Sequence, residues 1–226
     1  MADSTHQPSG TADGPFACTG RGETECKILA AAFALFREQG IHATTTRKIA
    51  EAAGVNEVTL FRNFGSKDGL LQAIVETQLA DKQKMIAQID AWNGDPADEI
   101  RILGTMMWTM IHDRREWMQI VVRNVHLYPQ LAVIIDRFRQ PLYETIVRYF
   151  ERHIKAGRLR AVEPRLAATM LVGPLMSMRL SFDTPARLVP AGITPEQVFD
   201  FHIESYLSYL LPERQPVART KGKKQR

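Results

Sequence analysis

The chain lacks a long apolar stretch, since no uninterrupted run of apolar residues approaches the roughly 18 that a membrane-spanning helix needs. Its first residues also lack the basic flank and apolar core of a secretory signal. With 45% apolar residues among 226, the chain can nevertheless bury a substantial core in one or two domains. We therefore expect a cytoplasmic protein with no membrane partner.

Cysteine is scarce, and catalytic patterns are missing. Cys18 and Cys26 have no cluster of further ligands near them, so neither a disulfide framework nor a zinc site has support. We expect two reduced thiols, with a redox sensor as the alternative. The histidines form no His-x-x-x-His or Glu-x-x-His pair, and there is no nucleophile motif. The sequence thus indicates no catalytic residue, no metal site and no cofactor.

The net charge of +4 does not by itself indicate nucleic-acid binding. Residues 212–226 hold six basic residues and one acidic residue, so the remainder of the chain carries a net charge of −1. Binding to DNA must therefore be argued from individual side chains rather than from the overall charge.

Residues 43–67 read as two short helices joined by a tight turn. The hydroxyl of Thr45 or Thr46 can cap the first helix, Gly54 supplies the positive φ that ends it, and Asn56 can cap the second. The apolar residues of the second helix should pack on the first: Val58, Leu60, Phe61 and Phe64. The residues left outward are short donors and acceptors suited to base edges in the major groove: Glu57, Thr59, Arg62 and Asn63. The pattern predicts a helix-turn-helix.

This segment resembles the DNA-binding domain of the TetR regulators of bacteria. The family pattern falls on these positions: Thr45, Thr46, Ile49, Ala50, Gly54, Val55, Leu60, Phe61, Phe64 and Lys67. The resemblance implies a double-stranded DNA operator. Thr45, Thr46 and Arg47 should meet phosphates or the groove edge, and Lys67 a phosphate. Glu57, Thr59, Arg62 and Asn63 should face the bases, and Asn56 is also among the expected DNA-binding residues. Arg62 is the candidate for a bidentate contact to guanine. Phe61 stands where the family usually has tyrosine, so a phosphate-contacting hydroxyl is absent; its ring either meets a thymine methyl or belongs to the core.

Helical spacing of apolar residues continues beyond this segment, and no strand alternation persists. We predict an all-α protein: a disordered tail over residues 1–22, a three-helix DNA-binding domain over 23–66, a larger helical effector-binding and dimerisation domain over 67–211, and a basic tail over 212–226. The first helix should end at Gly40, and one long helix should run from Lys67 to about Trp92. Pro141 should kink or split a later helix.

The last predicted helix, residues 195–211, is apolar on nearly every face and must be covered on two sides. A second subunit is a plausible cover, and TetR-like proteins build a four-helix dimer interface from their last two long helices. Twofold symmetry also suits DNA recognition. The predicted homodimer contacts are Phe199, His202, Tyr206, Leu207 and Leu210.

Methionine and tryptophan gather in two parts of the larger domain, and their adaptable apolar surfaces suit a small-molecule pocket. The candidate effector-binding residues are Met107, Trp108, Ile111, Trp117, Met170 and Met178. Ordinary core packing is the alternative for each of them. The leading hypothesis is a homodimeric repressor released from a palindromic operator by a small apolar or amphipathic effector. An all-helical enzyme and a constitutive DNA-binding protein without an effector are the alternatives.

Overall fold

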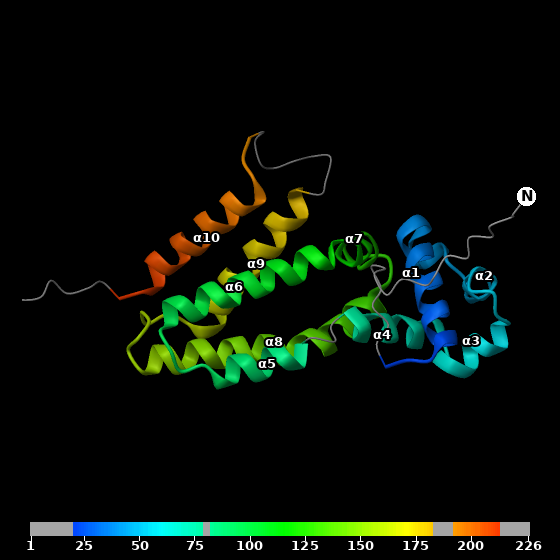
Figure 1. The fold of residues 1–226 in the computed structure, drawn as a ribbon, viewed down its shortest axis with the longest axis horizontal. Coiled ribbons are helices and arrows are strands. Elements are labelled where there is room, and N and C mark those ends of the chain that lie inside the picture. The colour runs from blue at the N-terminus through cyan, green and yellow to red at the C-terminus, as the bar shows by residue number, and fades with distance from the viewer. Residues whose placement is uncertain (1–19, 79–81, 183–191, 213–226) are drawn as a thin grey trace, which may run out of the picture.

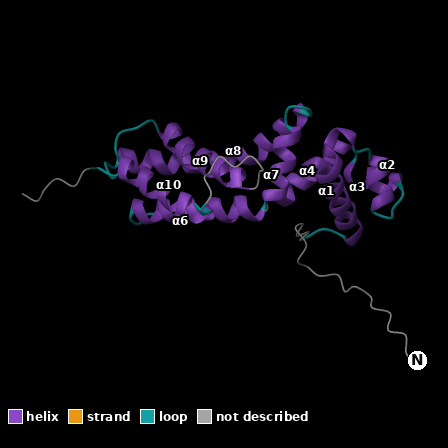
Figure 2. Cartoon of the chain, turned by 90° about the horizontal axis from the view of Figure 1, so that it is seen from above, coloured by secondary structure: helices purple, strands orange, loops and turns teal. Residues whose placement is uncertain are grey.

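The computed structural model describes residues 20–78, 82–182 and 192–212, and the regular elements in these ranges are all α-helices. They are α1 Glu23–Ala43, α2 Thr46–Ala52, α3 Glu57–Phe64, α4 Lys67–Gln78, α5 Lys82–Ala91, α6 Pro96–Asp113, α7 Arg115–Asn124, α8 Pro129–Lys155, α9 Pro164–Phe182 and α10 Pro195–Leu210. The molecule is elongated, with α1 to α3 at one end, α4 and α7 next to them, and α5, α6, α9 and α10 toward the other end (Figures 1 and 2). Within the described ranges, no helix is long and apolar enough to cross a membrane.

The predicted boundaries of the two short helices are confirmed. The hydroxyl of Thr45 accepts a hydrogen bond from the backbone N–H of Lys48 at 3.2 Å, and the Asn56 side chain accepts one from Val58 at 2.9 Å. Between these caps, Gly54 has a φ of 67°, a left-handed conformation that glycine adopts without steric cost. The turn between α2 and α3 is thus fixed by local chemistry.

Two other helix predictions have different outcomes. The expected single helix from Lys67 to Trp92 is described as α4 and α5, while residues 79–81, through which it would have to continue, lie outside the described residues. Helix α8 continues through Pro141, so the helix is not split there.

The expectation of reduced thiols is wrong for Cys26, which is disulfide-bonded. Cys18 lies outside the described residues.

The buried apolar side chains of the described residues form two separate cores. One encloses side chains of α5, α6, α9, α10 and the second half of α8. The other holds α1 to α4 together, and it continues into α7 and the start of α8, because Trp117, Ile120 and Leu131 are buried in it. The helix-turn-helix therefore does not rest on a core of its own; α7 and α8 contribute part of the surface that buries α1 and α4.

A buried amide joins α7 to the break in α1. Gly40, with a φ of 82°, interrupts α1 at the residue where the sequence predicts its end. The Asn124 side-chain oxygen accepts a hydrogen bond from the Ile41 N–H at 2.8 Å, and its amide nitrogen donates to the Ile120 carbonyl at 2.7 Å. A Cβ added at Gly40 would lie 3.1 Å from that oxygen, so the close approach also favours glycine.

We predict that Asn124→Ala lowers the free energy of unfolding by about 1 to 3 kcal/mol, because the Ile41 N–H is left buried without an acceptor. Urea denaturation followed by circular dichroism measures this change. The matched control is Asn93→Ala, at an exposed loop position, which should change stability by less than about 0.5 kcal/mol. Equal effects of the two substitutions would contradict a structural role for the Asn124 contact.

Candidate DNA-binding face and ligand cavity

The N-termini of α2 and α3 are tied together by a side-chain hydrogen bond. The Thr46 hydroxyl donates to the Glu57 carboxylate at 2.6 Å, and both residues are half-buried. Ile49 and Leu60 are completely buried beneath them. Glu57 is thus engaged in fixing the angle between the two helices, rather than being presented as an open acceptor to bases. Thr59 is also half-buried. Of the four residues predicted to face the bases, two are therefore only partly exposed.

The exposed face of α3 differs from the predicted one. Val58 and Phe61 were expected to pack on α2, but 72% of Val58 and 45% of Phe61 are exposed. Leu60 and Phe64 alone of the four predicted residues pack into the core. Val58, Phe61 and Arg62 are spaced i, i+3 and i+4, so they share one outward strip of the helix. The outward position of Val58 could not be predicted from its apolar character, which is equally typical of a buried residue.

Arg62 is exposed and makes no ion pair or hydrogen bond within the part of the chain that the structure describes. Its neighbour Asn63 is also exposed, and its side-chain amide donates to the Thr59 carbonyl at 2.7 Å. The guanidinium of Arg62 is therefore available to a partner without first breaking an internal contact. It lies beside the apolar groups of Val58 and Phe61.

The remaining predicted DNA contacts lie on or beside α2 and at the start of α4. Thr45 and Arg47 are exposed, and Arg47 forms an ion pair with Glu51 at 3.0 Å. Lys67 is different: its ammonium donates to the Ile41 carbonyl and lies 5.6 Å from the centre of the Tyr128 ring. Burial lowers the pKa of Lys67. Lys67 thus holds α4 against the end of α1 and the start of α8, and its predicted phosphate contact stays a prediction.

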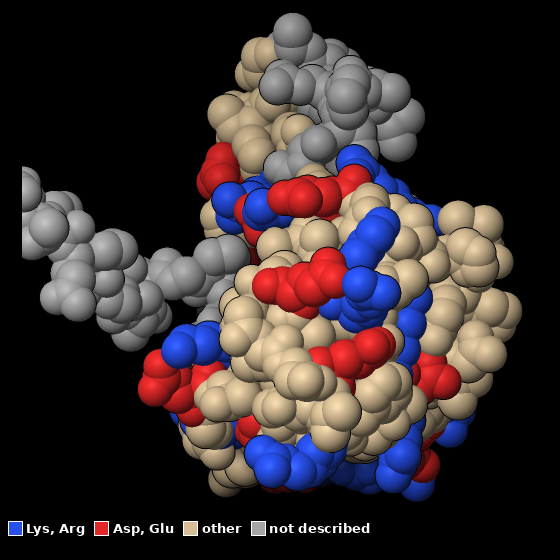
Figure 3. All heavy atoms as spheres, turned by 90° about the vertical axis from the view of Figure 1, so that its right-hand side faces the viewer, with Lys and Arg blue, Asp and Glu red and all other residues tan. Residues whose placement is uncertain are grey.

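Charges of both signs are mixed at the end of the molecule that carries α1 to α3. Figure 3 shows Lys and Arg side chains beside Asp and Glu side chains, with a broad uncharged area between them. This agrees with the near-neutral sequence outside the C-terminal tail. This end of the molecule therefore does not present a uniform positive field.

A cavity of about 120 Å³ lies between the helices of the larger part of the molecule. Its walls come from α4 to α9 and from Arg114, between α6 and α7: Val75, Lys82, Met107, Met110, Ile111, Arg114, Trp117, Met118, Val121, Ile135, Phe138, Arg139, Leu142, Tyr143, Ile146, Val172 and Met176. Three of the six candidate effector residues are among them, namely Met107, Ile111 and Trp117. The α8 residues of the wall could not be predicted from the sequence, because their apolar spacing is the same as that of core residues.

The other three candidate effector residues do not line this cavity. The Trp108 ring packs against Phe199 of α10, with ring centres 5.3 Å apart. Met170 points away from the interior, since 53% of it is exposed on α9. Met178 is half-buried on the same helix but is absent from the cavity wall. Helical spacing alone could not say which of these residues face a void.

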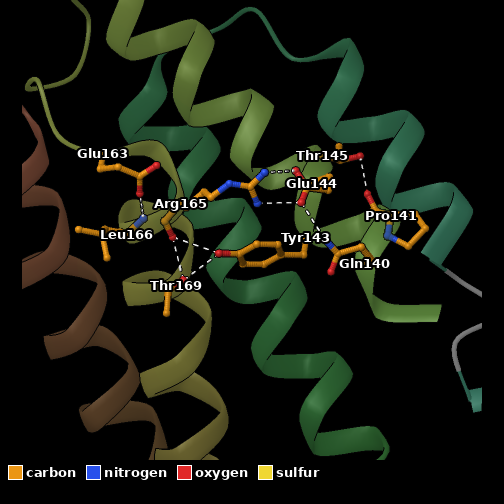
Figure 4. A network of polar contacts seen from close by, with 9 residues as sticks. All are labelled: Gln140, Pro141, Tyr143, Glu144, Thr145, Glu163, Arg165, Leu166 and Thr169. Carbon is orange, nitrogen blue, oxygen red and sulfur yellow. Dashed lines mark hydrogen bonds and ion pairs between the residues drawn. The ribbon is translucent and has the colours of Figure 1, made fainter. Parts of the chain in front are cut away.

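One wall of the cavity is anchored by a polar network between α8 and α9 (Figure 4). The Arg165 guanidinium forms two hydrogen bonds with the Glu144 carboxylate, at 2.8 and 3.2 Å. The Tyr143 hydroxyl lies 2.9 Å from the Thr169 hydroxyl and donates to the Arg165 carbonyl at 3.2 Å. Because Tyr143 lines the cavity, this network fixes the position of that wall.

The predicted dimer contacts on α10 are largely inward. Tyr206, Leu207 and Leu210 are buried in the chain's own core, and Tyr206 donates a hydrogen bond to the Ala167 carbonyl at 2.6 Å. These three side chains are therefore unavailable to a second subunit, while Phe199 and His202 are half-buried. The large apolar side chains that remain exposed on the last two helices are Phe201 and Tyr209 of α10 and Leu166 and Met170 of α9.

Residues 28–74 match the sequence profile described as bacterial regulatory proteins, tetR family. The chain is 29% identical over 128 residues to the uncharacterized HTH-type transcriptional regulator YvkB of Bacillus subtilis, covering 57% of this chain and 66% of YvkB. It is 35% identical over 131 residues to the HTH-type transcriptional repressor Rv3405c of Mycobacterium tuberculosis, covering 56% of this chain and 64% of Rv3405c. Each alignment thus spans slightly less than two thirds of the relative.

Among solved structures, the SmeT–triclosan complex shares the fold, with a TM-score of 0.70 at 21% identity. The match covers 91% of this chain and 100% of that one. The likeness therefore extends beyond the helix-turn-helix to the arrangement of the larger helical part.

Proposed function

This chain belongs to the TetR family of bacterial regulatory proteins, and on that premise we propose that it is a homodimeric repressor of transcription. In this proposal α3 reads a palindromic DNA operator, and a small molecule in the cavity releases the protein from it. The observation that carries the proposal is the outward strip of α3, in which Arg62 is unpaired among the described residues beside exposed Val58 and Phe61.

The chemistry of this strip matches the edges of bases in the major groove. The guanidinium of Arg62 can donate two hydrogen bonds to the acceptors of a guanine, while Val58 and Phe61 can contact the methyl group of thymine. Large apolar groups that stay exposed contribute no hydrophobic free energy to the folding of the single chain, because their surface is not removed from water. A groove that buries them supplies the reason for their exposure.

The effector part of the proposal rests on the cavity and its position. The cavity is lined mainly by apolar side chains, which favours an apolar or amphipathic ligand over a constitutive protein with a filled core. In the related fold of SmeT, the structure is a complex with triclosan. The name of Rv3405c as a repressor supports repression here, rather than activation.

Helix α7 offers a direct route from ligand to DNA. Its residues Trp117, Met118 and Val121 line the cavity, while its Asn124 holds the break in α1. Helix α4 contributes Val75 to the same cavity. We infer that both helices move with the ligand; a tenfold change in DNA affinity needs about 1.4 kcal/mol of coupling between the sites.

The dimer is proposed to form through the outer faces of α9 and α10. Leu166, Met170, Phe201 and Tyr209 leave apolar surface uncovered there, although the opposite side of α10 is buried in the core. These four residues replace the dimer contacts predicted from the sequence. As predicted, α10 would be covered on two sides, by the core of its own chain and by the second subunit. A twofold dimer places two copies of α3 on one DNA duplex.

We predict that Arg62→Ala lowers affinity for the duplex that the protein prefers by about 5- to 150-fold, the equivalent of about 1 to 3 kcal/mol. The loss should vanish on duplexes in which the contacted guanine is replaced. Fluorescence anisotropy at fixed salt, on duplexes with single base-pair changes, measures this. Arg137→Ala is the matched control, since it removes an exposed arginine from α8. Equal weakening on every duplex would remove Arg62 from base reading.

A second prediction concerns the dimer. Phe201→Glu places a charge in the proposed apolar interface and should give a folded monomer, because 76% of Phe201 is exposed in the single chain. Val133→Glu places the same charge at a 71% exposed valine on α8 and should remain dimeric. Sedimentation velocity separates the two outcomes, with thermal melting to show that both variants fold. A dimeric Phe201→Glu protein would rule out this face.

A further inference from the structure

We propose that the ligand of the cavity is a small amphipathic anion, with one apolar ring or short chain and a carboxylate or similar acidic group. This inference rests on the proposed effector site and adds to it the charge and the size of the ligand. It is argued from the distribution of charged and apolar side chains around the cavity.

The cavity has an apolar floor. Met107, Ile111, Trp117 and Ile146 line the cavity, are at most 4% exposed and have largely apolar side chains. An ionised group placed against these side chains would lose its hydration without gaining a partner. The floor therefore accepts the apolar part of a ligand.

The wall also includes three cations that reach solvent: Lys82 of α5 and Arg114 between α6 and α7 are half-buried, and Arg139 of α8 is exposed. Among the wall residues that the structure describes, none is an aspartate or a glutamate. Since the cations are partly exposed and the floor is buried, the charge lies toward the open side of the cavity. A ligand with an apolar body and an anionic end would satisfy both regions at once.

Lys82 is the best placed of the three. Its ammonium donates to the Phe138 carbonyl at 2.8 Å and lies 5.4 Å from the centre of the Phe138 ring. These neutral partners orient the ammonium at the wall without cancelling its charge. Arg139, by contrast, forms an ion pair with Asp136 at 2.8 Å while its guanidinium lies 5.6 Å from the Tyr143 ring. Arg114 donates to the carbonyls of Gln78 and Met110.

The size of the cavity limits the ligand. An apolar cavity of about 150 Å³ in another protein is known to hold benzene, and the present one has about 120 Å³. A single ring with a small substituent therefore fills the enclosed part, and its polar end reaches the open side. A long acyl chain or a fused-ring system would require the helices to separate.

Three probes of nearly equal shape test the charge: 4-methylbenzoate, 4-methylbenzyl alcohol and 4-methylbenzylamine. Titration calorimetry with the full chain should show the anion binding about five-fold more tightly than the alcohol, and the amine most weakly. In Lys82→Gln the preference for the anion should largely disappear while the affinity for the alcohol is kept. Lys82→Arg should retain the preference, and Lys84→Gln, at an exposed position on the same helix, should behave as the parent protein.

The outcomes separate the two proposals. If the alcohol or the amine binds as tightly as the anion, or if Lys82→Gln keeps the full preference, the ligand is not selected as an anion, and the effector site stands without this inference. If none of the probes binds, the inference and the assignment of this cavity as the effector site both fail.

Discussion

The arrangement of the molecule depends on the burial of α7 against α1. Asn124 satisfies the Ile41 N–H at the point where Gly40 breaks α1, and Trp117 and Ile120 fill the apolar core beside it. Without this contact, the helix-turn-helix would lose part of the surface that buries α1 and α4. The orientation of α3 relative to the rest of the chain is thus set by packing between distant parts of the sequence, rather than only by the residues that join α3 to α4.

The same helix forms part of the cavity wall, so the two sites share a structural element. Trp117 takes part in both: it is 4% exposed, belongs to the core around α1, and lines the cavity. A ligand that displaces α7 must change this packing, because close-packed interiors transmit small shifts. The α8–α9 network around Tyr143 and Arg165 holds the opposite wall in place. Movement is therefore expected on the side of α7 and α4.

What the sequence could predict follows from how local each feature is. Thr45, Gly54 and Asn56 act on their own turn of backbone, so caps and turn were readable from residue type and spacing. Val58 and Tyr206 depend on which side of a helix faces the core, and apolar spacing alone cannot separate a core contact from a surface that awaits DNA or a second subunit. The cavity is even harder to predict from the sequence, because its shape depends on how many side chains from six helices pack together.

In the function proposed above, the outward strip of α3 contacts DNA and the outer faces of α9 and α10 join two copies of the chain. One short helix contacts too few base pairs for useful specificity, so the proposal places two copies on neighbouring turns of the duplex. Selection of bound duplexes from a random-sequence pool by the full chain tests this most directly. The account predicts enrichment of an inverted repeat whose half-sites lie about one helical turn, or a multiple of it, apart. Enrichment of a single asymmetric site, or no enrichment over the starting pool, would contradict it.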